Sequence, residues 1–183
     1  MSRRIQVFVL CEDLQSQVLL RQYLVLRGFP PRALRFDKLP AAVAGGCGSQ
    51  WVRERYATAV RTNRTRPVAE ALIVHIDADN HSVRHRHAEL GAALIEAGHF
   101  ARTDDDPIAL VVPCWETETW LHHFLGRPGV FEAHRGYPKF TNDQYTAAKP
   151  TAEALLACLH GAAAPPPNLP SFATAVAELT RLP

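Results

Sequence analysis

Two aspartates one residue apart follow a strongly apolar run in the segment 72–80, which reads LIVHIDADN. A β-branched run of this length is typical of a buried parallel strand, and strand side chains alternate between the two faces of a sheet. We therefore expect Asp77 and Asp79 to point the same way just beyond the end of a strand. Two like charges on one face repel each other unless a cation neutralises them or one of them holds a proton.

Acidic residues also follow two other apolar runs. Glu12 follows IQVFVL (5–10), and Glu116 and Glu118 follow IALVV (108–112). The carboxyl ends of parallel strands meet at one edge of a sheet, and this is the edge where open α/β proteins bind ligands. The three acidic groups are therefore predicted to lie together.

Carboxylate oxygens suit hard divalent cations, and Mg²⁺ in particular binds one or two carboxylates while keeping waters and substrate phosphates. We predict Asp77 and Asp79 as ligands of Mg²⁺ (or Mn²⁺), Glu12 as a ligand or a general acid or base, and Glu118 as the next candidate ligand. The ion would polarise a phosphodiester and lower the pKa of a bound water, which makes phosphoryl transfer feasible near neutral pH. Each acidic pair alone is more typical of turn and helix-capping chemistry than of a metal site. Their coincidence at three strand ends favours the metal site.

The elements that must position these residues alternate between strand and helix. We predict strands at 5–10, 33–36, 71–76 and 108–112, and helices at 14–27, 50–63, 83–97, 117–125, 145–160 and 171–181. This pattern predicts an α/β fold with a mostly parallel four-stranded sheet, helices on both faces and a C-terminal helical addition. We place the α/β core at residues 1–126, and an irregular segment with C-terminal helices packed on the core at 127–183.

Two groups of arginines are candidates for contacts with substrate phosphates. They are Arg53, Arg61 and Arg64 on the helix that begins near residue 50, and Arg84 and Arg86 just beyond the aspartates. At 100° per residue the first three lie within about 80° of one another and form a basic stripe. Both groups are also typical of a solvated helix face.

Only one glutamate of the segment WETETW is expected to reach the metal. On a helix Glu116 shares a face with Trp120, whereas Glu118 points roughly the other way. Glu116 is a candidate helix cap. Lys139 and Lys149 are candidates for a cationic group that stabilises transition-state charge, and the sequence leaves open whether either reaches the site.

A strand ending in glutamate, followed by a later strand ending in Asp-x-Asp, resembles the Toprim domain of topoisomerases, primases and the OLD-type nucleases. The resemblance implies that Glu12 is the general acid or base and that Asp77 and Asp79 bind Mg²⁺. The glycine that usually follows the glutamate in that family is replaced by Asp13 here.

A closer resemblance is carried by the segments VLCEDLQSQ, GCGSQWVRERY, HIDADN, IALVVPCWETETW and NLPSF. They are similar to a family of small bacterial proteins of Toprim-like type, in which the equivalent of Glu118-Thr119-Trp120 recurs. This resemblance favours Glu118 over Glu116 as the metal ligand.

Composition limits the classes of function. The chain has 183 residues, 47% hydrophobic and 21% charged, with a net charge of +2, so one sizeable domain is expected and any nucleic-acid surface must be local. There is no apolar stretch of about 18 residues or more, no signal-peptide cleavage site and no Cys-x-x-Cys pair. A cytoplasmic protein without a membrane span, zinc knuckle or disulfide framework is predicted.

The function predicted is that of a Mg²⁺-dependent, phosphodiester-cleaving nuclease of Toprim-like type, acting on nucleic acid, DNA more than RNA, in bacterial defence or DNA repair. The alternative is a non-catalytic or partner-dependent regulatory subunit that works with an ATPase or another effector protein. Nucleotidyl transfer would use the same acids but requires a nucleoside triphosphate pocket that the sequence does not reveal. The glycine-rich stretch AGGCG (44–48) lacks the Gly-Lys-Ser/Thr ending of a phosphate-binding loop.

Overall fold

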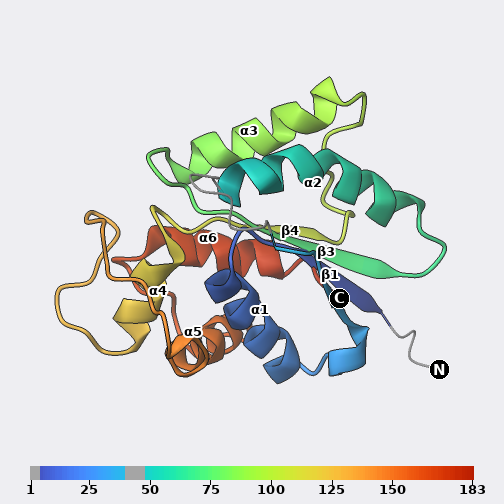
Figure 1. The fold of residues 1–183 in the computed structure, drawn as a ribbon. Coiled ribbons are helices and arrows are strands. Elements are labelled where there is room, and N and C mark those ends of the chain that lie inside the picture. Colours follow the sequence, from blue (N-terminus) through green and yellow to red (C-terminus); the bar gives the residue numbers. More distant parts are fainter. Residues whose placement is uncertain (1–4, 40–47) are drawn as a thin grey trace.

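The computed structural model describes residues 5–39 and 48–183, and these residues form an α/β fold around one parallel sheet (Figure 1). The strands are β1 (Gln6–Leu10), β2 (Leu34–Phe36), β3 (Glu70–His75) and β4 (Ile108–Val111). Their order in the sheet is β2-β1-β3-β4, and all neighbours are parallel. The predicted four-stranded parallel sheet is confirmed.

Six α-helices lie in the described part of the chain, close to the six that the sequence predicts. They are α1 (Leu14–Leu26), α2 (Gly48–Thr65), α3 (Val83–Glu96), α4 (Thr117–Phe124), α5 (Gln144–Leu159) and α6 (Pro170–Leu179). Most of the glycine-rich stretch 44–48 lies outside the described residues. No helix in the described ranges is long and apolar enough to cross a membrane.

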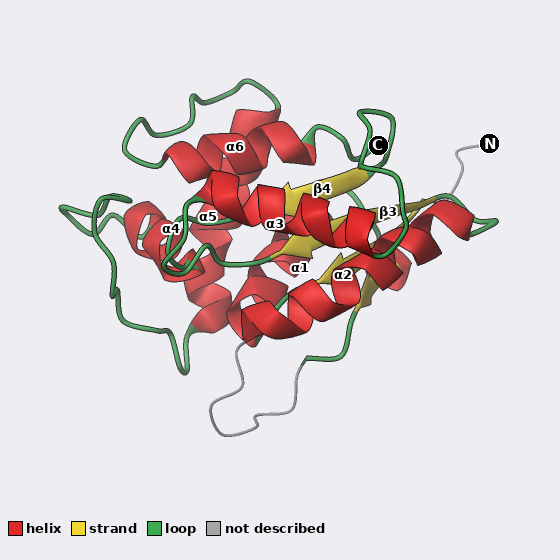
Figure 2. Cartoon of the chain, turned by 90° about the horizontal axis from the view of Figure 1, so that it is seen from above, coloured by secondary structure: helices red, strands yellow, loops and turns green. Residues whose placement is uncertain are grey.

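Helices cover both faces of the sheet, as predicted (Figures 1 and 2). Helices α2 and α3 pack on one face, and α1, α5 and α6 on the other, which we call the α1 face. The C-terminal helices share their apolar core with the sheet, since Leu155 and Phe172 belong to the same buried cluster as Val7 and Val9. The boundary that we place at residue 126 stays a prediction.

The side chains of β3 alternate between the two cores. Ala71 and Ile73 belong to the buried cluster on the α1 face, whereas Leu72 and Val74 belong to the cluster under α2 and α3. All six residues of the strand are buried, as expected for a central parallel strand. This alternation decides which side chains meet at the carboxyl end of the strand.

Candidate metal centre

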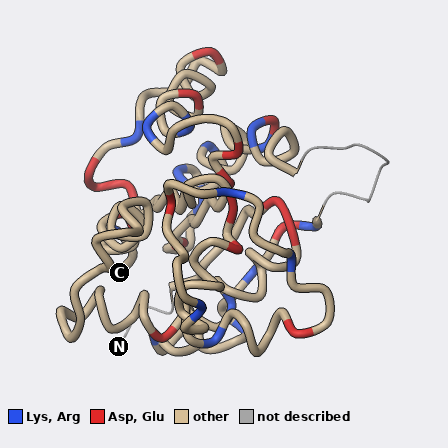
Figure 3. Tube along the Cα trace, turned by 90° about the vertical axis from the view of Figure 1, so that its left-hand side faces the viewer, with Lys and Arg blue, Asp and Glu red and all other residues tan. Residues whose placement is uncertain are grey.

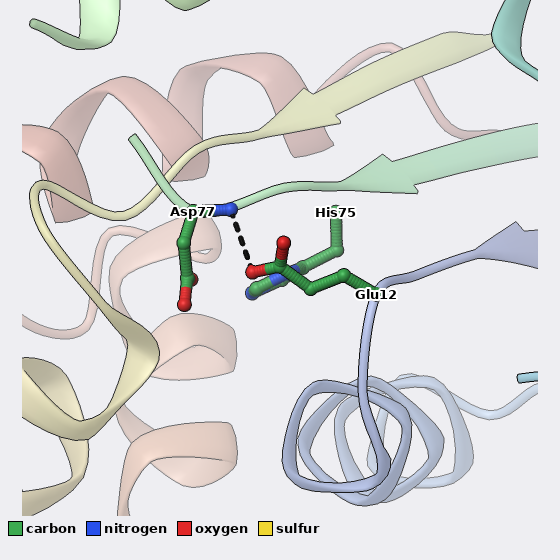
Figure 4. A group of neighbouring side chains, drawn as sticks. All are labelled: Glu12, His75 and Asp77. Carbon is green, nitrogen blue, oxygen red and sulfur yellow. Dashed lines mark hydrogen bonds between the residues drawn. The ribbon is translucent and has the colours of Figure 1, made fainter. Parts of the chain in front are cut away.

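Three side chains converge at the carboxyl ends of β1 and β3. One carboxylate oxygen each of Glu12 and Asp77 and one ring nitrogen of His75 lie within 4.8 Å of one another (Figure 4). The Asp77 amide donates a hydrogen bond of 3.0 Å to Oε1 of Glu12, which ties the two strand ends together. This is the one such metal-ligand group among the residues that the structure describes.

Strand alternation explains why His75 and Asp77 meet. They continue the series of odd-numbered β3 residues that face α1, after Ala71 and Ile73. Glu12 arrives from the neighbouring strand, because Leu10 at the end of β1 pairs with Val74. His75 is the residue that the sequence reasoning missed, because it lies inside an apolar run. Its spacing of two from Asp77 was the available signal.

Asp79 departs from the alternation that the sequence argument assumed. Its backbone has a φ of 54°, its amide donates to the carbonyl of Trp115 at 3.0 Å, and its side chain is 47% exposed. The positive φ turns the chain away from the extended path that would have kept Asp79 beside Asp77. Asp79 thus lies outside the Glu12, His75 and Asp77 cluster, and its role as a metal ligand stays a prediction.

Helix α4 brings two further polar groups to the cluster. The Thr117 hydroxyl donates a 3.0 Å hydrogen bond to Oδ1 of Asp77 and lies 3.2 Å from Nε2 of His75. Glu118 is only 1% exposed, and its Oε2 has no hydrogen-bond partner among the described residues. Its charge is close enough to raise the pKa of Asp77. Glu118 thus lies near Asp77 but outside the group of Glu12, His75 and Asp77, and its role as a metal ligand stays a prediction.

Burial dominates the electrostatics of the cluster. It raises the pKa of Glu12 to about 7, with further increases from Asp13 and Asp79. It also raises the pKa of Asp77 well above its ordinary value, and the Glu12 carboxylate adds to this rise. For His75, burial lowers the pKa to about 4, so the imidazole is neutral at pH 7. Without a cation, the two carboxyl groups retain a proton near neutral pH that a cation would displace.

The irregular segment before α5 is tied to α4. Oε1 of Glu116 accepts hydrogen bonds from the amides of Gly136 and Tyr137, at 3.1 and 2.8 Å. Nε2 of His122 lies 2.8 Å from the carbonyl oxygen of Pro138. Glu116 occupies the N-cap position of α4, but its side chain makes no capping hydrogen bond. Glu116 is therefore the N-cap residue by position, as predicted, but its carboxylate anchors the loop instead of capping the helix amides.

This anchoring brings Lys139 to the acidic edge. Burial lowers the pKa of Lys139, but the carboxylates of Glu118 and Asp13 are among those that together raise it above its ordinary value. The second candidate, Lys149, is exposed and lies 3.9 Å from Glu153 on the surface of α5. Only Lys139 is therefore placed as a cation of the site. Figure 3 looks onto this edge of the molecule, and acidic stretches lie near the centre of the view.

Arg86 is a structural residue of the site. It is 2% exposed, and its guanidinium donates to the carbonyl oxygens of Asp77 and Ala78 and to Oδ2 of Asp79. These contacts hold the backbone that carries the aspartates, and they leave Arg86 facing the protein instead of a substrate. Arg84, two residues earlier, is exposed near the same edge.

The predicted basic stripe of α2 is not a free phosphate surface. Arg53 pairs with Glu89 at 2.6 Å, and Arg64 pairs with Asp106 at 2.6 Å and donates to carbonyls of the loop between α3 and β4. That loop leads into the amino end of β4, so Arg64 lies at the edge opposite the acids. Arg61, close to Arg64 in sequence, is exposed. Arg53 reaches Glu89 because α2 and α3 pack side by side.

The arrangement fits a divalent cation. Nδ1 of His75 and Oε2 of Glu118 are buried and have no hydrogen-bond partner among the described residues, and two carboxyl groups lie within the ligand group. Buried groups of this kind are normally paired or bound to a metal. Comparison of the chain with protein-family models, with curated proteins and with solved structures gave no match.

Proposed function

We propose that this protein is a metal-dependent nuclease that cleaves phosphodiester bonds, with DNA as its first substrate. The observation that carries the proposal is the buried group of Glu12, His75 and Asp77 at the carboxyl ends of β1 and β3, with the buried carboxylate of Glu118 close enough to raise the pKa of Asp77. Such a group can hold a divalent cation, which offsets the negative charge of the phosphodiester and the further negative charge that attack by water creates. A bound divalent cation would supply Lewis acidity there.

The protein's own residues suit the remaining steps. Glu12 lies beside Asp77 at the acidic edge, where its carboxylate can take a proton from an attacking water or return one to a leaving group. The Thr117 hydroxyl contacts both Asp77 and His75 and so fixes the orientation of their side chains. Lys139 brings a positive charge to the acidic edge, where it offsets charge that develops on the phosphoryl oxygens.

Candidate contacts for the nucleic-acid backbone surround this point. Arg84 is exposed at the start of α3. Arg135 is also exposed, and it donates a 2.6 Å hydrogen bond to Oδ1 of Asn80, one residue beyond the Asp77 and Asp79 turn. These two arginines replace Arg53, Arg64 and Arg86 in our proposal, since those three are engaged with acidic residues.

The test is cleavage of labelled single-stranded and double-stranded DNA and RNA by the full chain, with Mg²⁺ or Mn²⁺ and with chelator. Glu118→Gln should abolish cleavage, whereas Glu153→Gln, which changes an exposed glutamate on α5, should leave it intact. If the folded wild type binds metal but cleaves none of these substrates, the nuclease proposal is rejected. This result would favour the alternative, a regulatory subunit that works with an ATPase or another effector protein.

A further inference from the structure

His75 is a polar residue in an apolar position. It is the last residue of β3, it is fully buried, and its neighbours along the α1 face are apolar. Burying an imidazole is unfavourable unless its nitrogens find partners. In the described part of the protein, however, Nδ1 has no hydrogen-bond partner. This unpaired nitrogen requires an explanation that packing does not give.

The hydrogen bonds of Thr117 indicate which ring nitrogen of His75 carries the proton. The Thr117 hydroxyl has a single proton, which it donates to Asp77, so its oxygen accepts from Nε2–H of His75. Nδ1 is then the unprotonated nitrogen and carries a free lone pair. A metal-bound histidine usually donates its other ring N–H to a fixed oxygen acceptor, and the Thr117 hydroxyl occupies that position here.

We propose that His75 is a ligand of the cation, and that the site therefore selects a first-row transition ion, such as Mn²⁺ or Zn²⁺, over Mg²⁺. The donor set is one imidazole nitrogen with the carboxylates of Glu12 and Asp77. Mg²⁺ prefers oxygen ligands and keeps its waters, whereas imidazole suits transition ions, with affinities that rise from Mn²⁺ toward Cu²⁺. The inference rests on the metal centre of the proposed nuclease but is independent of cleavage.

The first experiment is calorimetric titration of the chelator-treated full chain with Mn²⁺, Co²⁺, Zn²⁺ and Mg²⁺. His75→Asn should weaken the binding of Mn²⁺, Co²⁺ and Zn²⁺ by about tenfold or more and change Mg²⁺ binding by less than about twofold. The matched control is His85→Asn, because His85 is exposed and stacks on His81 away from the cluster. It should bind every ion like the wild type. Equal losses for Mg²⁺ and Mn²⁺ in His75→Asn, or no loss for Mn²⁺, would overturn the proposal.

A second measurement needs no variant and so does not depend on how His75→Asn folds. Pulsed electron paramagnetic resonance of the Mn²⁺-loaded wild type should show coupling to an imidazole ¹⁴N. Absence of this coupling in a saturated sample would overturn the proposal. If the coupling is present but no nucleic acid is cleaved, the histidine ligand is supported and the nuclease proposal is rejected. If nucleic acid is cleaved but the coupling is absent, the nuclease proposal is supported and the histidine ligand is rejected.

Discussion

His75 and Asp77 point to the same face of the sheet from positions two residues apart, and a nitrogen of one lies within 4.8 Å of a carboxylate oxygen of the other. The pair is buried, and its partner Glu12 reaches it from the next strand. A neutral imidazole beside two carboxyl groups that retain a proton is poised to exchange that proton for a cation. Stability, pH and metal binding are therefore coupled at this one point.

The apoprotein should lose stability as the pH rises through about 7. Burial raises the pKa of Glu12 to about 7 and also raises the pKa of Asp77. At pH values above the ordinary pKa of these carboxyl groups, the folded protein therefore binds more protons than the unfolded chain. Their contribution to stability is complete at low pH and is lost as the pH passes the folded pKa. His75, with a pKa lowered to about 4, acts in the opposite sense, but only between about pH 4 and 6.5.

Glu12→Gln should remove part of this pH dependence. In urea denaturation with chelator at pH 8, the variant should be more stable than the wild type by at most about 3 kcal/mol, and the difference should vanish near pH 4.5. Glu153→Gln, on the exposed surface of α5, should follow the wild type at both pH values. Parallel pH profiles for the wild type and Glu12→Gln would contradict the assignment.

Arg86 should be essential for stability, whereas its neighbour Arg84 should not. Arg86→Met removes donors to the carbonyls of Asp77 and Ala78 and unpairs Asp79, at a cost of about 2–4 kcal/mol. Arg84→Met changes an exposed residue of the same type on the same helix, and its free energy of unfolding should stay within about 0.5 kcal/mol of the wild type. Urea denaturation of both variants at pH 7 measures the difference. Equal losses would show that Arg86 is a surface residue in solution.

The sheet and the acidic edge could be predicted from the sequence because both follow from local periodicity. Alternating strand and helix patterns fix a parallel sheet, and the carboxyl ends of its strands place Glu12, Asp77 and Glu118 at one edge. Asp79 could not be placed, because its left-handed backbone donates a hydrogen bond to the carbonyl of Trp115, and a contact so distant in the chain leaves no local signal.

Long-range contacts explain the other differences. The pairing of Arg64 with Asp106 spans 42 residues, so helical spacing predicts a stripe but not its partner. Lys139 reaches the site because Glu116 holds the loop ahead of it, a contact without periodicity. His75 was hidden for a different reason, since a buried strand of apolar residues masks a single polar one.

Arg64 should act in folding and not in substrate binding. Arg64→Ala leaves Asp106 without its partner and removes donors to two carbonyls of the loop between α3 and β4, so it should cost about 1–3 kcal/mol of stability. Arg61→Ala, in the same turn of α2 and exposed, should cost less than about 0.5 kcal/mol. Binding of a labelled oligonucleotide below the unfolding temperature should be unchanged in both. If Arg64→Ala bound the oligonucleotide more weakly and its stability were unchanged, the result would support the original prediction that Arg64 contacts substrate phosphates.

Lys139 should control the ionisation of Glu118. Burial raises the pKa of Glu118, and the ammonium group of Lys139 opposes that rise. Lys139→Met removes the opposing charge, so the pKa of Glu118 should increase further. Titration of ¹³C-labelled glutamate carboxyl groups by NMR, with Glu118→Gln used to assign the resonance, measures this shift directly.

Lys149→Met is the matched control for this titration. Lys149 lies beside Glu153 on the exposed surface of α5, so its loss should leave the Glu118 resonance unchanged. The comparison separates a local charge effect from a general change in net charge, because both variants lose one positive charge. If the two variants shifted Glu118 equally, the loop that carries Lys139 would not lie against α4 in solution. A shift confined to Lys139→Met would place one cation among the acids, where the proposed nuclease would use it to offset charge on the phosphoryl oxygens.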